Sequence, residues 1–312
     1  MRHDDGPPAT DQRTLVLNPV SGDGSHTDHV RELADAHGFD VRETERSGDA
    51  IELARTAAEE GADLVAACGG DGTLNEAVRG LWNADALPDT AFAVVPGGTG
   101  NNFAGNVGVE GLDHAFDLVE TGEWRTVDLG LVRVDGGDPV PFLNSCVGGL
   151  TANASASTSS EQKDRFGVLA YVFNALQEMT AFDGLTLDIT PVGGGEHWRG
   201  DAACVLVGNG RRFPAEGGTQ ANMEDGHLDV TVVEDYQTVD LAGEAAVHRL
   251  FGRETENITR LQATALDVTV READPVTFSL DGELATAADL HVECRAGVLR
   301  LPVGEAYDPA PE

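Results

Sequence analysis

The first 123 residues alternate between short apolar runs and segments in which apolar residues recur with helical spacing. The apolar runs predict strands at 14–18, 39–44, 62–68 and 91–96. Helical periods predict helices at 26–37, 49–60 and near 112–122, with one more after the glycine-rich loop that follows the third strand. Strands that alternate with helices of about ten residues indicate a mainly parallel sheet covered by helices on both faces.

The pattern changes after Glu123, where short β-rich runs such as WRTVDLGLVRV and HLDVTVVED are separated by glycine, aspartate and proline. This pattern is typical of an antiparallel β-sandwich, and 161–182 and 239–252 read as helical insertions within it. We therefore expect an α/β domain at 1–124, whose residues 1–12 are disordered, and an antiparallel β-sandwich domain at 125–312.

The charge of the chain excludes one class of partner. The 312 residues include 54 acidic and 20 basic ones, for a formal net charge of −34, and Lys163 is the single lysine. Nucleic-acid binding needs clustered lysine and arginine, so we expect no nucleic-acid partner. Because the acidic residues are spread along the chain, we interpret them as adaptation to a salt-rich cytoplasm, where a screening length of about 3 Å at molar salt hides their mutual repulsion.

The cysteines and the apolar runs bear on the compartment. Cys68, Cys146, Cys204 and Cys294 form neither a CxxC pair nor a zinc spacing, and their apolar surroundings predict buried thiols in a reducing compartment. The first residues are polar and unlike a signal peptide, and no run approaches the roughly 18 apolar residues that span a bilayer. We expect a cytoplasmic protein that is at most peripheral at the membrane.

The stretch AACGGDGTLNEAV, from Ala66 to Val78, holds the strongest candidate chemistry. Apolar residues at helical spacing follow Thr73, so a strand, a glycine turn and a helix start come in succession. Backbone N–H groups of Gly69, Gly70 and Gly72 can then point at phosphate oxygens, with the helix dipole adding partial positive charge. The alternative is a glycine-rich turn with a helix cap at Asp71 or Thr73.

Two further loops follow predicted strands, namely NPVSG at 18–22 and PGGTGNNFA at 96–104. Alone, NPVSG can be an ordinary turn. Because ligands of parallel sheets bind beyond the carboxyl ends of the strands, we expect the three loops to converge on one crevice, as a nucleotide site requires.

The order of these motifs resembles a known family. NPxSG, GGDGTLNE, PxGTxNxFA, VDLG, GNG, DGxLDV and DGE follow one another from Asn18 to Glu283, as in the diacylglycerol kinase catalytic-domain family, which includes bacterial diacylglycerol, sphingosine and ceramide kinases. The resemblance implies an α/β domain like that of NAD kinases and phosphofructokinases, joined to a β-sandwich, with ATP in the cleft between them.

The resemblance also assigns roles to single residues. It implies that Glu283 accepts the proton of the substrate hydroxyl, and that Asp71 and Asp128 complete an acidic network around the metal and the acceptor. The implied ATP contacts are Asn18, Pro19, Ser21, Gly22, Thr44, Gly69, Gly70, Asp71, Gly72, Thr73, Asn75 and Thr99.

ANMEDGHLDV resembles the structural magnesium loop of the family, in which the Asp225 carboxylate would bind Mg²⁺ with main-chain oxygens of Asn222 and His227. An oxygen-only set completed by water suits magnesium, although a polar hairpin turn is an equal interpretation of the spacing.

Asp71 is an unexpected residue in a phosphate loop, and the nucleotide's own cation explains it. ATP arrives with Mg²⁺, which a carboxylate beside the phosphates can hold or orient. The chain lacks a P-loop lysine, so Mg²⁺, backbone amides and arginine must offset the phosphate charge. Arg46, Arg211 and Arg212 are candidates, with solvated surface arginine as the alternative for each.

We therefore predict an ATP- and Mg²⁺-dependent lipid kinase that transfers the γ-phosphate to a hydroxyl of a lipid or long-chain alcohol. The alternatives are a soluble-substrate kinase of the NAD kinase-like type and a non-catalytic nucleotide-sensing protein, against which the presence of both Asp71 and Glu283 argues. Asn102 stands where most family members carry aspartate, a departure that bears on specificity. Transient contact with a membrane surface and a homodimer both stay open.

Overall fold

The chain forms two compact units. The computed structural model describes residues 12–149, 184–215, 218–234 and 258–311. Unit 1 comprises Met1–Leu129 with Ala296–Pro309, and unit 2 comprises Gly130–Arg295 with Ala310–Glu312. The helical insertions expected at 161–182 and 239–252, and the disorder expected at the N-terminus, fall outside the described residues, apart from Gln12.

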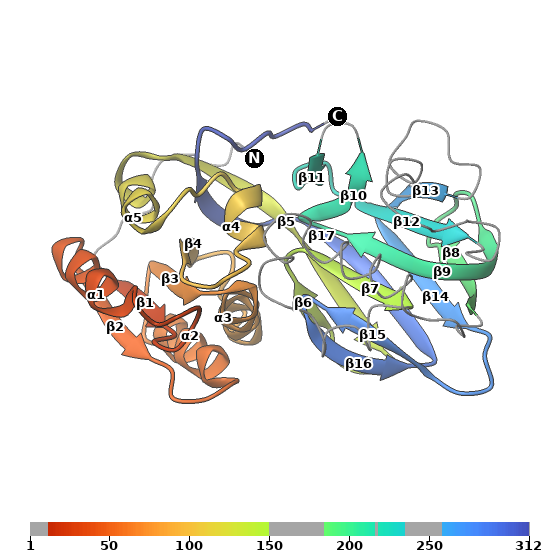
Figure 1. Cartoon of the computed structure of the whole chain (residues 1–312), viewed down its shortest axis with the longest axis horizontal. Helices are drawn as coiled ribbons and strands as arrows, with labels where there is room; N and C mark the ends of the chain where they lie inside the picture. Colours follow the sequence, from red (N-terminus) through yellow and green to blue (C-terminus); the bar gives the residue numbers. More distant parts are fainter. Residues whose placement is uncertain (1–11, 150–183, 216–217, 235–257, 312) are drawn as a thin grey trace. The chain divides into compact units, whose positions relative to one another are not determined.

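A four-stranded parallel sheet with the order β2-β1-β3-β4 forms the centre of unit 1 (Figure 1). Its strands are β1 (Arg13–Leu17), β2 (Phe39–Glu43), β3 (Leu64–Gly69) and β4 (Ala91–Pro96). Every residue of β3 is buried, as expected for a central strand of a parallel sheet with both faces covered. The four strands agree with the apolar runs of the sequence.

Helices cover both faces of this sheet. They are α1 (Thr27–Ala36), α2 (Asp49–Glu59), α3 (Asp71–Asn83), α4 (Asn102–Asn106) and α5 (Leu112–Thr121). Right-handed crossovers place α1 on the face opposite α2 and α3, in agreement with the packing of α2 on α3 and of α1 on α5. Gly80 permits the close contact of α2 and α3, because a Cβ there would lie 2.3 Å from the Ile51 carbonyl oxygen.

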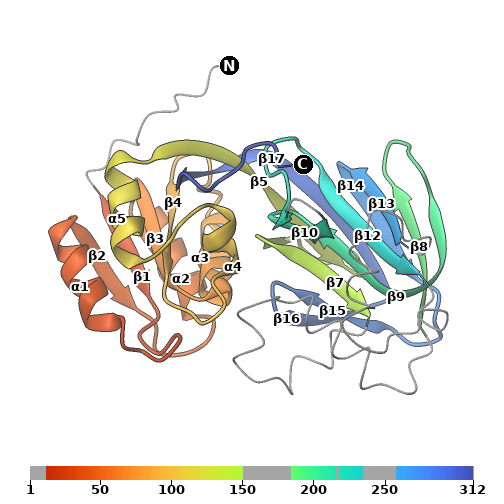
Figure 2. The same ribbon diagram turned by 45° about the horizontal axis from the view of Figure 1, so that its top comes forward.

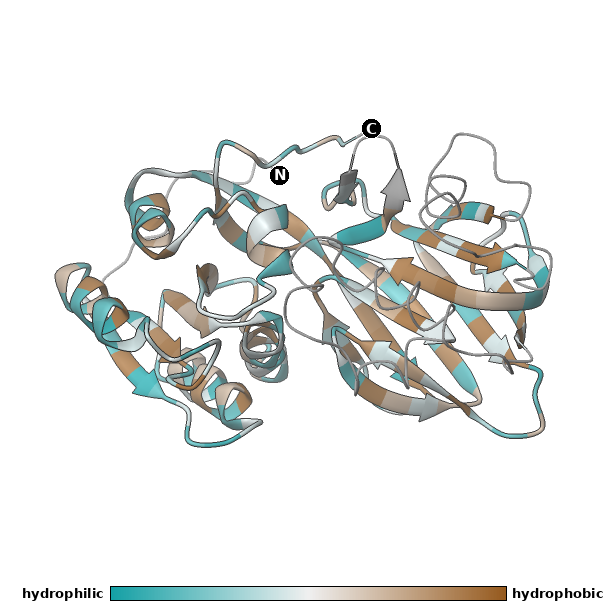
Figure 3. Ribbon diagram, viewed as in Figure 1, coloured by the Kyte–Doolittle hydropathy of each residue, from teal (hydrophilic) through white to brown (hydrophobic). Residues whose placement is uncertain are grey.

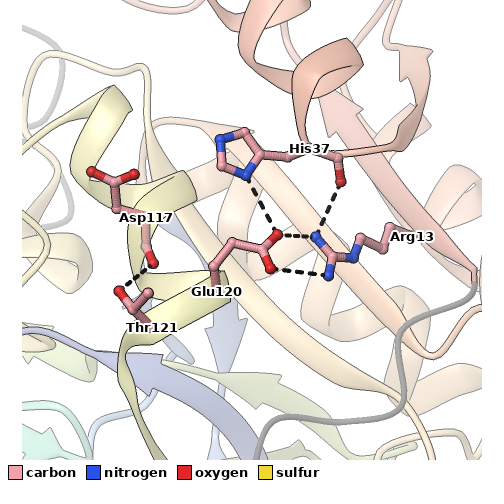
Figure 4. Close-up of polar contacts among 5 residues, drawn as sticks. All are labelled: Arg13, His37, Asp117, Glu120 and Thr121. Carbon is pink, nitrogen blue, oxygen red and sulfur yellow. Dashed lines mark hydrogen bonds and ion pairs between the residues drawn. The ribbon is translucent and has the colours of Figure 1, made fainter.

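A polar cluster at the amino end of β1 attaches α5 to the sheet (Figure 4). Arg13 donates hydrogen bonds to the Glu120 carboxylate and, at 3.1 Å, to the His37 carbonyl. The hydrogen bond from Arg13 lowers the pKa of Glu120. Beside it, the Thr121 hydroxyl donates to the Asp117 carbonyl at 2.9 Å. This cluster lies at the edge of the sheet opposite the glycine-rich loops and therefore has a structural role.

Unit 2 is built from antiparallel strands, and in the described part of the chain eleven strands, β5 and β17 among them, form one hydrogen-bonded network. The strands after α5 are β5 (Glu123–Val134), β6 (Val140–Phe142), β7 (Ser145–Gly149), β8 (Leu185–Pro191), β9 (Trp198–Gly208), β10 (Arg211–Ala215), β11 (Gly218–Gln220), β12 (Leu228–Glu234), β13 (Ile258–Ala263), β14 (Ala265–Val270), β15 (Val276–Leu280), β16 (Glu283–Ala287) and β17 (Asp289–Val303). The predicted fold class, a parallel α/β domain followed by an antiparallel β domain, is confirmed.

Two glycines allow aromatic rings to fill the core of unit 2. A Cβ on Gly130 would lie 2.3 Å from the ring of Phe142, its cross-strand partner, and one on Gly148 would lie 2.5 Å from the ring of Phe278. Figure 3 shows apolar and polar residues alternating along these strands, as expected where one side of a strand faces a core. The glycine of VDLG therefore has a packing role.

The compact units differ from the boundary expected between residues 124 and 125. β5 begins in unit 1 and continues into unit 2, and its neighbour β17 runs back so that 296–309 belong to unit 1 (Figure 2). There the Gly304 N–H donates to the Val107 carbonyl at 2.9 Å, and a Cβ on Gly304 would lie 2.0 Å from the Gly108 oxygen. Residues 296–309 thus complete the first unit.

All four cysteines are free thiols. Cys68, Cys146 and Cys204 are buried, and burial raises the pKa of each thiol to about 12, while Cys294 is half-buried. Within the described ranges, no helix has the length and apolar character needed to cross a bilayer.

Candidate nucleotide site and DGE turn

Three loops meet at the carboxyl edge of the parallel sheet in unit 1. We call residues 18–26 loop 1, residues 69–73 loop 2 and residues 96–103 loop 3; they follow β1, β3 and β4. In the order β2-β1-β3-β4, β2 is added on one side of β1, and β3 and β4 are added on the other. The strand order therefore switches between β1 and β3, and parallel sheets bind ligands at such a switch point. The topology alone therefore places loops 1 and 2 beside a candidate site.

Direct contacts hold the three loops together. Between loops 1 and 2, the Asn18 amide donates to the Thr73 hydroxyl at 3.0 Å. A Cβ on Gly22 would lie 2.9 Å from the Gly97 carbonyl oxygen, and one on Gly98 would lie 2.3 Å from the Cα of Gly70. The expected convergence of the loops is thus present within unit 1, and it depends on glycine because the backbones touch.

Both oxygens of the Asp71 carboxylate bind the start of α4. Oδ1 accepts the Phe103 N–H at 2.8 Å, and Oδ2 accepts the backbone and side-chain N–H groups of Asn102 at 3.0 and 2.9 Å. A carboxylate at a helix N-terminus satisfies free amides and interacts favourably with the helix dipole. Asn102 therefore contributes a donor that a second carboxylate could not, and Asp71 has a visible task in attaching loop 3 to loop 2.

Loop 3 is a tight turn closed by Asn101, whose φ of +30° lies in the left-handed region. The Asn101 side chain accepts the Gly98 N–H at 2.9 Å and donates to the Gly98 carbonyl at 2.7 Å. Thr99 and Gly100 are exposed at the tip of the turn. The fold therefore presents the Thr99 hydroxyl to solvent, where a ligand can reach it.

Loop 1 contains a histidine that the sequence analysis did not single out. The Ser21 hydroxyl donates to the Asn18 carbonyl at 2.9 Å and lies 3.3 Å from Nε2 of His26. A Cβ on Gly97 would lie 3.0 Å from the same Nε2, so His26 contacts loops 1 and 3 together. In the sequence, the feature that could have pointed to His26 is its place at the start of a predicted helix. Pro19 is held in loop 1 by the Thr27 hydroxyl, which donates to its carbonyl at 3.0 Å.

No side-chain hydrogen bond caps the start of α3 in the described part of the chain. Neither Asp71 nor Thr73 caps this helix among the described residues, so the alternative of a side-chain-capped turn is not what the structure shows. Asn75 is 2% exposed, and its Oδ1 has no hydrogen-bond partner in the described part of the chain. Since an unpaired buried polar atom is costly, this oxygen is an unusual feature next to loop 2. Thr44 lies at the same edge, with its N–H bound to the Leu17 carbonyl at 2.9 Å.

Asp128 is 2% exposed, and its Oδ1 accepts the Gly297 N–H at 2.8 Å. This bond joins β5 to β17 within unit 1. The structure thus gives Asp128 a role in strand pairing. Its implied part in an acidic network stays a prediction.

The DGE sequence of unit 2 forms the hairpin turn between β15 and β16. Asp281 and Gly282 have φ values of +47° and +97°, as two-residue Asp-Gly turns require, and Leu280 pairs with Glu283. The Asp281 carboxylate accepts the N–H groups of Leu143, Asn144 and Ser145 at 2.6, 3.0 and 2.8 Å. Glu283 is exposed as the first residue of β16.

The GNG motif binds the same segment from its other side. The Asn209 N–H donates to the Asn144 carbonyl at 2.9 Å, while the Asn209 side chain and the Gly210 N–H donate to the Leu143 carbonyl at 3.0 and 2.9 Å. Arg211 is only 5% exposed, so the alternative of a solvated surface arginine is wrong for it. Arg46, in contrast, is an exposed partner of Asp49.

The predicted magnesium turn is closed by its own side chains. Asn222 Oδ1 accepts the Glu224 N–H at 3.0 Å, Asp225 Oδ1 accepts the His227 N–H at 2.8 Å, and His227 Nδ1 lies 2.7 Å from the Asp225 carbonyl oxygen. Nowhere in the described ranges do three or more His, Cys, Asp or Glu side chains gather as a metal site would require. One carboxylate with main-chain oxygens still fits Mg²⁺ when water completes the set, so this site stays a prediction.

Comparisons with known proteins agree with the motif order. Residues 12–132 match the diacylglycerol kinase catalytic domain, and residues 144–303 match the YegS C-terminal NAD kinase beta sandwich-like domain. Proteins named "Probable lipid kinase YegS" from Salmonella typhimurium and Salmonella choleraesuis are 31% identical over 297 residues, or 92% of this chain and 94% of theirs.

Solved structures share the fold. A diacylglycerol kinase structure from Bacillus anthracis str. Sterne has a TM-score of 0.71 at 20% identity, and it covers 96% of this chain and 99% of the other. A second structure from that organism reaches a TM-score of 0.77 at 24% identity over the same shares of the two chains. On the matched domains and the identity to these relatives, the chain belongs to the lipid kinase family in which a diacylglycerol kinase catalytic domain precedes a YegS-type C-terminal domain.

Proposed function

We propose that this protein is an ATP-dependent, magnesium-requiring lipid kinase that transfers the γ-phosphoryl group to a hydroxyl of a lipid or long-chain alcohol. Membership of the lipid kinase family supports a phosphotransferase. The observation that carries the ATP assignment is the meeting of loops 1, 2 and 3 at the carboxyl edge of the sheet, with backbone against backbone at Gly22–Gly97 and Gly70–Gly98.

The proposed phosphate site is formed mainly by backbone. The N–H groups at the start of α3 and the dipole of that helix attract anions, and the glycines of loop 2 let oxygens approach without side chains in the way. Among the side chains there, the exposed Thr99 hydroxyl can donate a hydrogen bond to a phosphate oxygen, whereas the buried Asn75 Oδ1 can only accept one and would need a donor of the ligand.

Asp71 is suited to a cation bound with the nucleotide. A carboxylate oxygen can accept about two hydrogen bonds, and Oδ1 receives one, from Phe103, so it can take a further partner. Bound Mg²⁺ would supply positive charge that offsets the phosphate oxygens. Because α4 already holds the Asp71 carboxylate in place, the side chain is oriented before any ligand arrives.

Glu283 is the proposed general base. The hydroxyl oxygen of the acceptor forms a bond to the γ-phosphorus, the bond to the bridging oxygen breaks, and ADP leaves with the electron pair. The hydroxyl proton passes to the Glu283 carboxylate, which is useful because an alcohol ionises far above neutral pH. The exposure of Glu283 on β16 leaves it accessible to an acceptor.

Contact with a membrane would be transient, since anionic lipids repel a chain of net charge −34 unless salt screens it.

The test uses purified protein in concentrated KCl with Mg²⁺, γ-labelled ATP and a total lipid extract. We expect label in an organic-soluble product. Label in a water-soluble product would instead favour the NAD kinase-like alternative, and ATP binding without any transfer would favour a nucleotide sensor. The variants Asp71→Asn and Glu283→Ala should each lose phosphotransfer while keeping cooperative unfolding, and wild-type transfer by both would contradict the proposed mechanism.

A further inference from the structure

Among the described residues of unit 2, two Asp-Gly turns have positive φ at both residues. In one, Asp135 and Gly136 have φ values of +47° and +74°; in the other, Asp281 and Gly282 have φ values of +47° and +97°. Each aspartate carboxylate accepts backbone N–H groups from a neighbouring segment, Asp135 from Ala288 and Asp289 at 3.0 and 2.9 Å. Asp281 accepts three consecutive N–H groups, those of 143–145. The two turns thus share positive φ at both residues and a carboxylate that accepts backbone N–H groups, and they differ in the residues next to them.

The Asp281 turn leads directly into Glu283, with Gly282 alone between them. Gly282 is exposed with no atom within 4 Å of the place a Cβ would occupy, and Leu284, after Glu283, is 56% exposed. Side-chain packing therefore gives little support to the start of β16. Besides the pairing of β16 with β15, the hydrogen bonds of the Asp281 carboxylate support this turn, together with the Asp281 N–H, which donates to the Ser145 carbonyl at 3.0 Å.

The segment that Asp281 binds is itself fixed. Its N–H groups bind Asp281, and the carbonyls of Leu143 and Asn144 accept hydrogen bonds from the GNG segment. Asn209, which supplies two of those donors, is 1% exposed. The DGE turn is therefore held against a buried part of unit 2, and Asp281 is the side chain that makes the connection.

We propose that Asp281 is a positioning residue that holds Glu283 in the orientation needed for proton transfer from the acceptor. This inference rests on the proposed function, in which Glu283 is the base. The Asp281 carboxylate accepts three charge-assisted hydrogen bonds that fix the turn, and a displacement of about 1 Å at a reacting group can cost about 10²-fold in rate.

The test compares Asp281→Asn with Asp135→Asn. Both oxygens of Asp281 accept N–H groups, so in Asp281→Asn the amide N–H₂ must face a backbone donor and the variant should unfold at a lower temperature. Asp135 accepts both of its printed bonds on Oδ1, so Asp135→Asn can keep them with its amide oxygen and should change stability less. We expect Asp281→Asn to lower kcat by about 10²-fold while the KM for ATP stays within about twofold, and Asp135→Asn to leave kcat unchanged. A structural role alone would leave the kcat of the folded fraction unchanged in both.

A double-mutant cycle identifies the route of the effect. In a Glu283→Gln background, Asp281→Asn should lower kcat no further, because the group it positions is already gone. If Asp281→Asn does not fold, Gly282→Ala takes its place with Gly136→Ala as control, since both glycines have positive φ and open space at the Cβ. The first should lower kcat and the second should not.

Three results would overturn the positioning role: wild-type kcat in Asp281→Asn, an equal loss in Asp135→Asn, or a full further loss in the Glu283→Gln background. Each presupposes an active wild type. A wild-type protein that phosphorylates no lipid would contradict the proposed function itself, and with it the inference drawn from it.

Discussion

The contact between loops 2 and 3 makes Gly98→Ala a quantitative test of the nucleotide site. A Cβ on Gly98 would lie 2.3 Å from Cα and 2.8 Å from N of Gly70. Carbon atoms pack at about 3.5–4.0 Å, so the loops would have to separate by about 1 Å. Both contacting atoms are backbone, and therefore no side-chain rotation can relieve the overlap.

Overpacking of this kind costs about 1–3 kcal/mol. We expect this free-energy cost to fall on the arrangement of the loops that binds the nucleotide. Because every 1.4 kcal/mol changes the Kd by about tenfold, the affinity for ATP should fall by roughly one to two orders of magnitude. The assay is a calorimetric titration with ATP and Mg²⁺ in concentrated KCl, accompanied by thermal unfolding of the same samples.

Gly105→Ala is the matched control, because Gly105 is exposed in α4 with nothing within 4 Å of its would-be Cβ. Alanine favours helix over glycine by about 1 kcal/mol, so this variant should be slightly more stable and bind ATP as the wild type does. Wild-type ATP affinity in Gly98→Ala would refute the reasoning that loops 2 and 3 form the site through their contact.

Three further predictions concern stability and reactivity. The melting temperature should rise between 0.1 M and molar KCl, because the screening length shortens from about 10 to about 3 Å around a net charge of −34, and a flat dependence would count against this. The three buried cysteines, with thiol pKa values of about 12, should resist a thiol reagent at pH 8 until the protein is unfolded, whereas Cys294 should react first; rapid modification of all four would show that burial does not protect them. Hydrogen bonds from Arg271 and His197 lower the pKa of Asp188 to about 2, so their stabilisation is present above the unfolded value of about 3.9 and is lost as the pH falls toward 2. Arg271→Gln should therefore move acid unfolding to higher pH, and an unchanged acid transition would show that this pair does not contribute.

Local pattern was sufficient for the α/β unit. The four parallel strands follow from apolar runs between helical periods, and the loops after β1, β3 and β4 were expected at one edge because parallel strands share their carboxyl ends. The helix start after loop 2 was equally visible, since apolar residues recur at helical spacing from Leu74 onward. The Asp-Gly turn before Glu283 is another local signal, since Asp-Gly is a common two-residue hairpin turn.

The partners of single polar groups were not predictable in the same way. The sequence suggested a cation for Asp71, and the structure shows its oxygens bound to the start of α4, a short helix with too few residues to show a period. Likewise Arg211 sits in a polar stretch of sequence and is buried in the fold. Hydrogen-bond partners far apart in the chain leave no periodic trace in it.

The sequence by itself determined the class of each unit, the position of the glycine-rich turns and the family, because all of these depend on short-range patterns of residue type and on motif order. Only the tertiary structure decided that β17 returns to complete unit 1, that Gly98 touches Gly70, and that Asp281 is bound to 143–145. The physical reason is that such contacts join residues distant along the chain, and the packing of whole elements selects them.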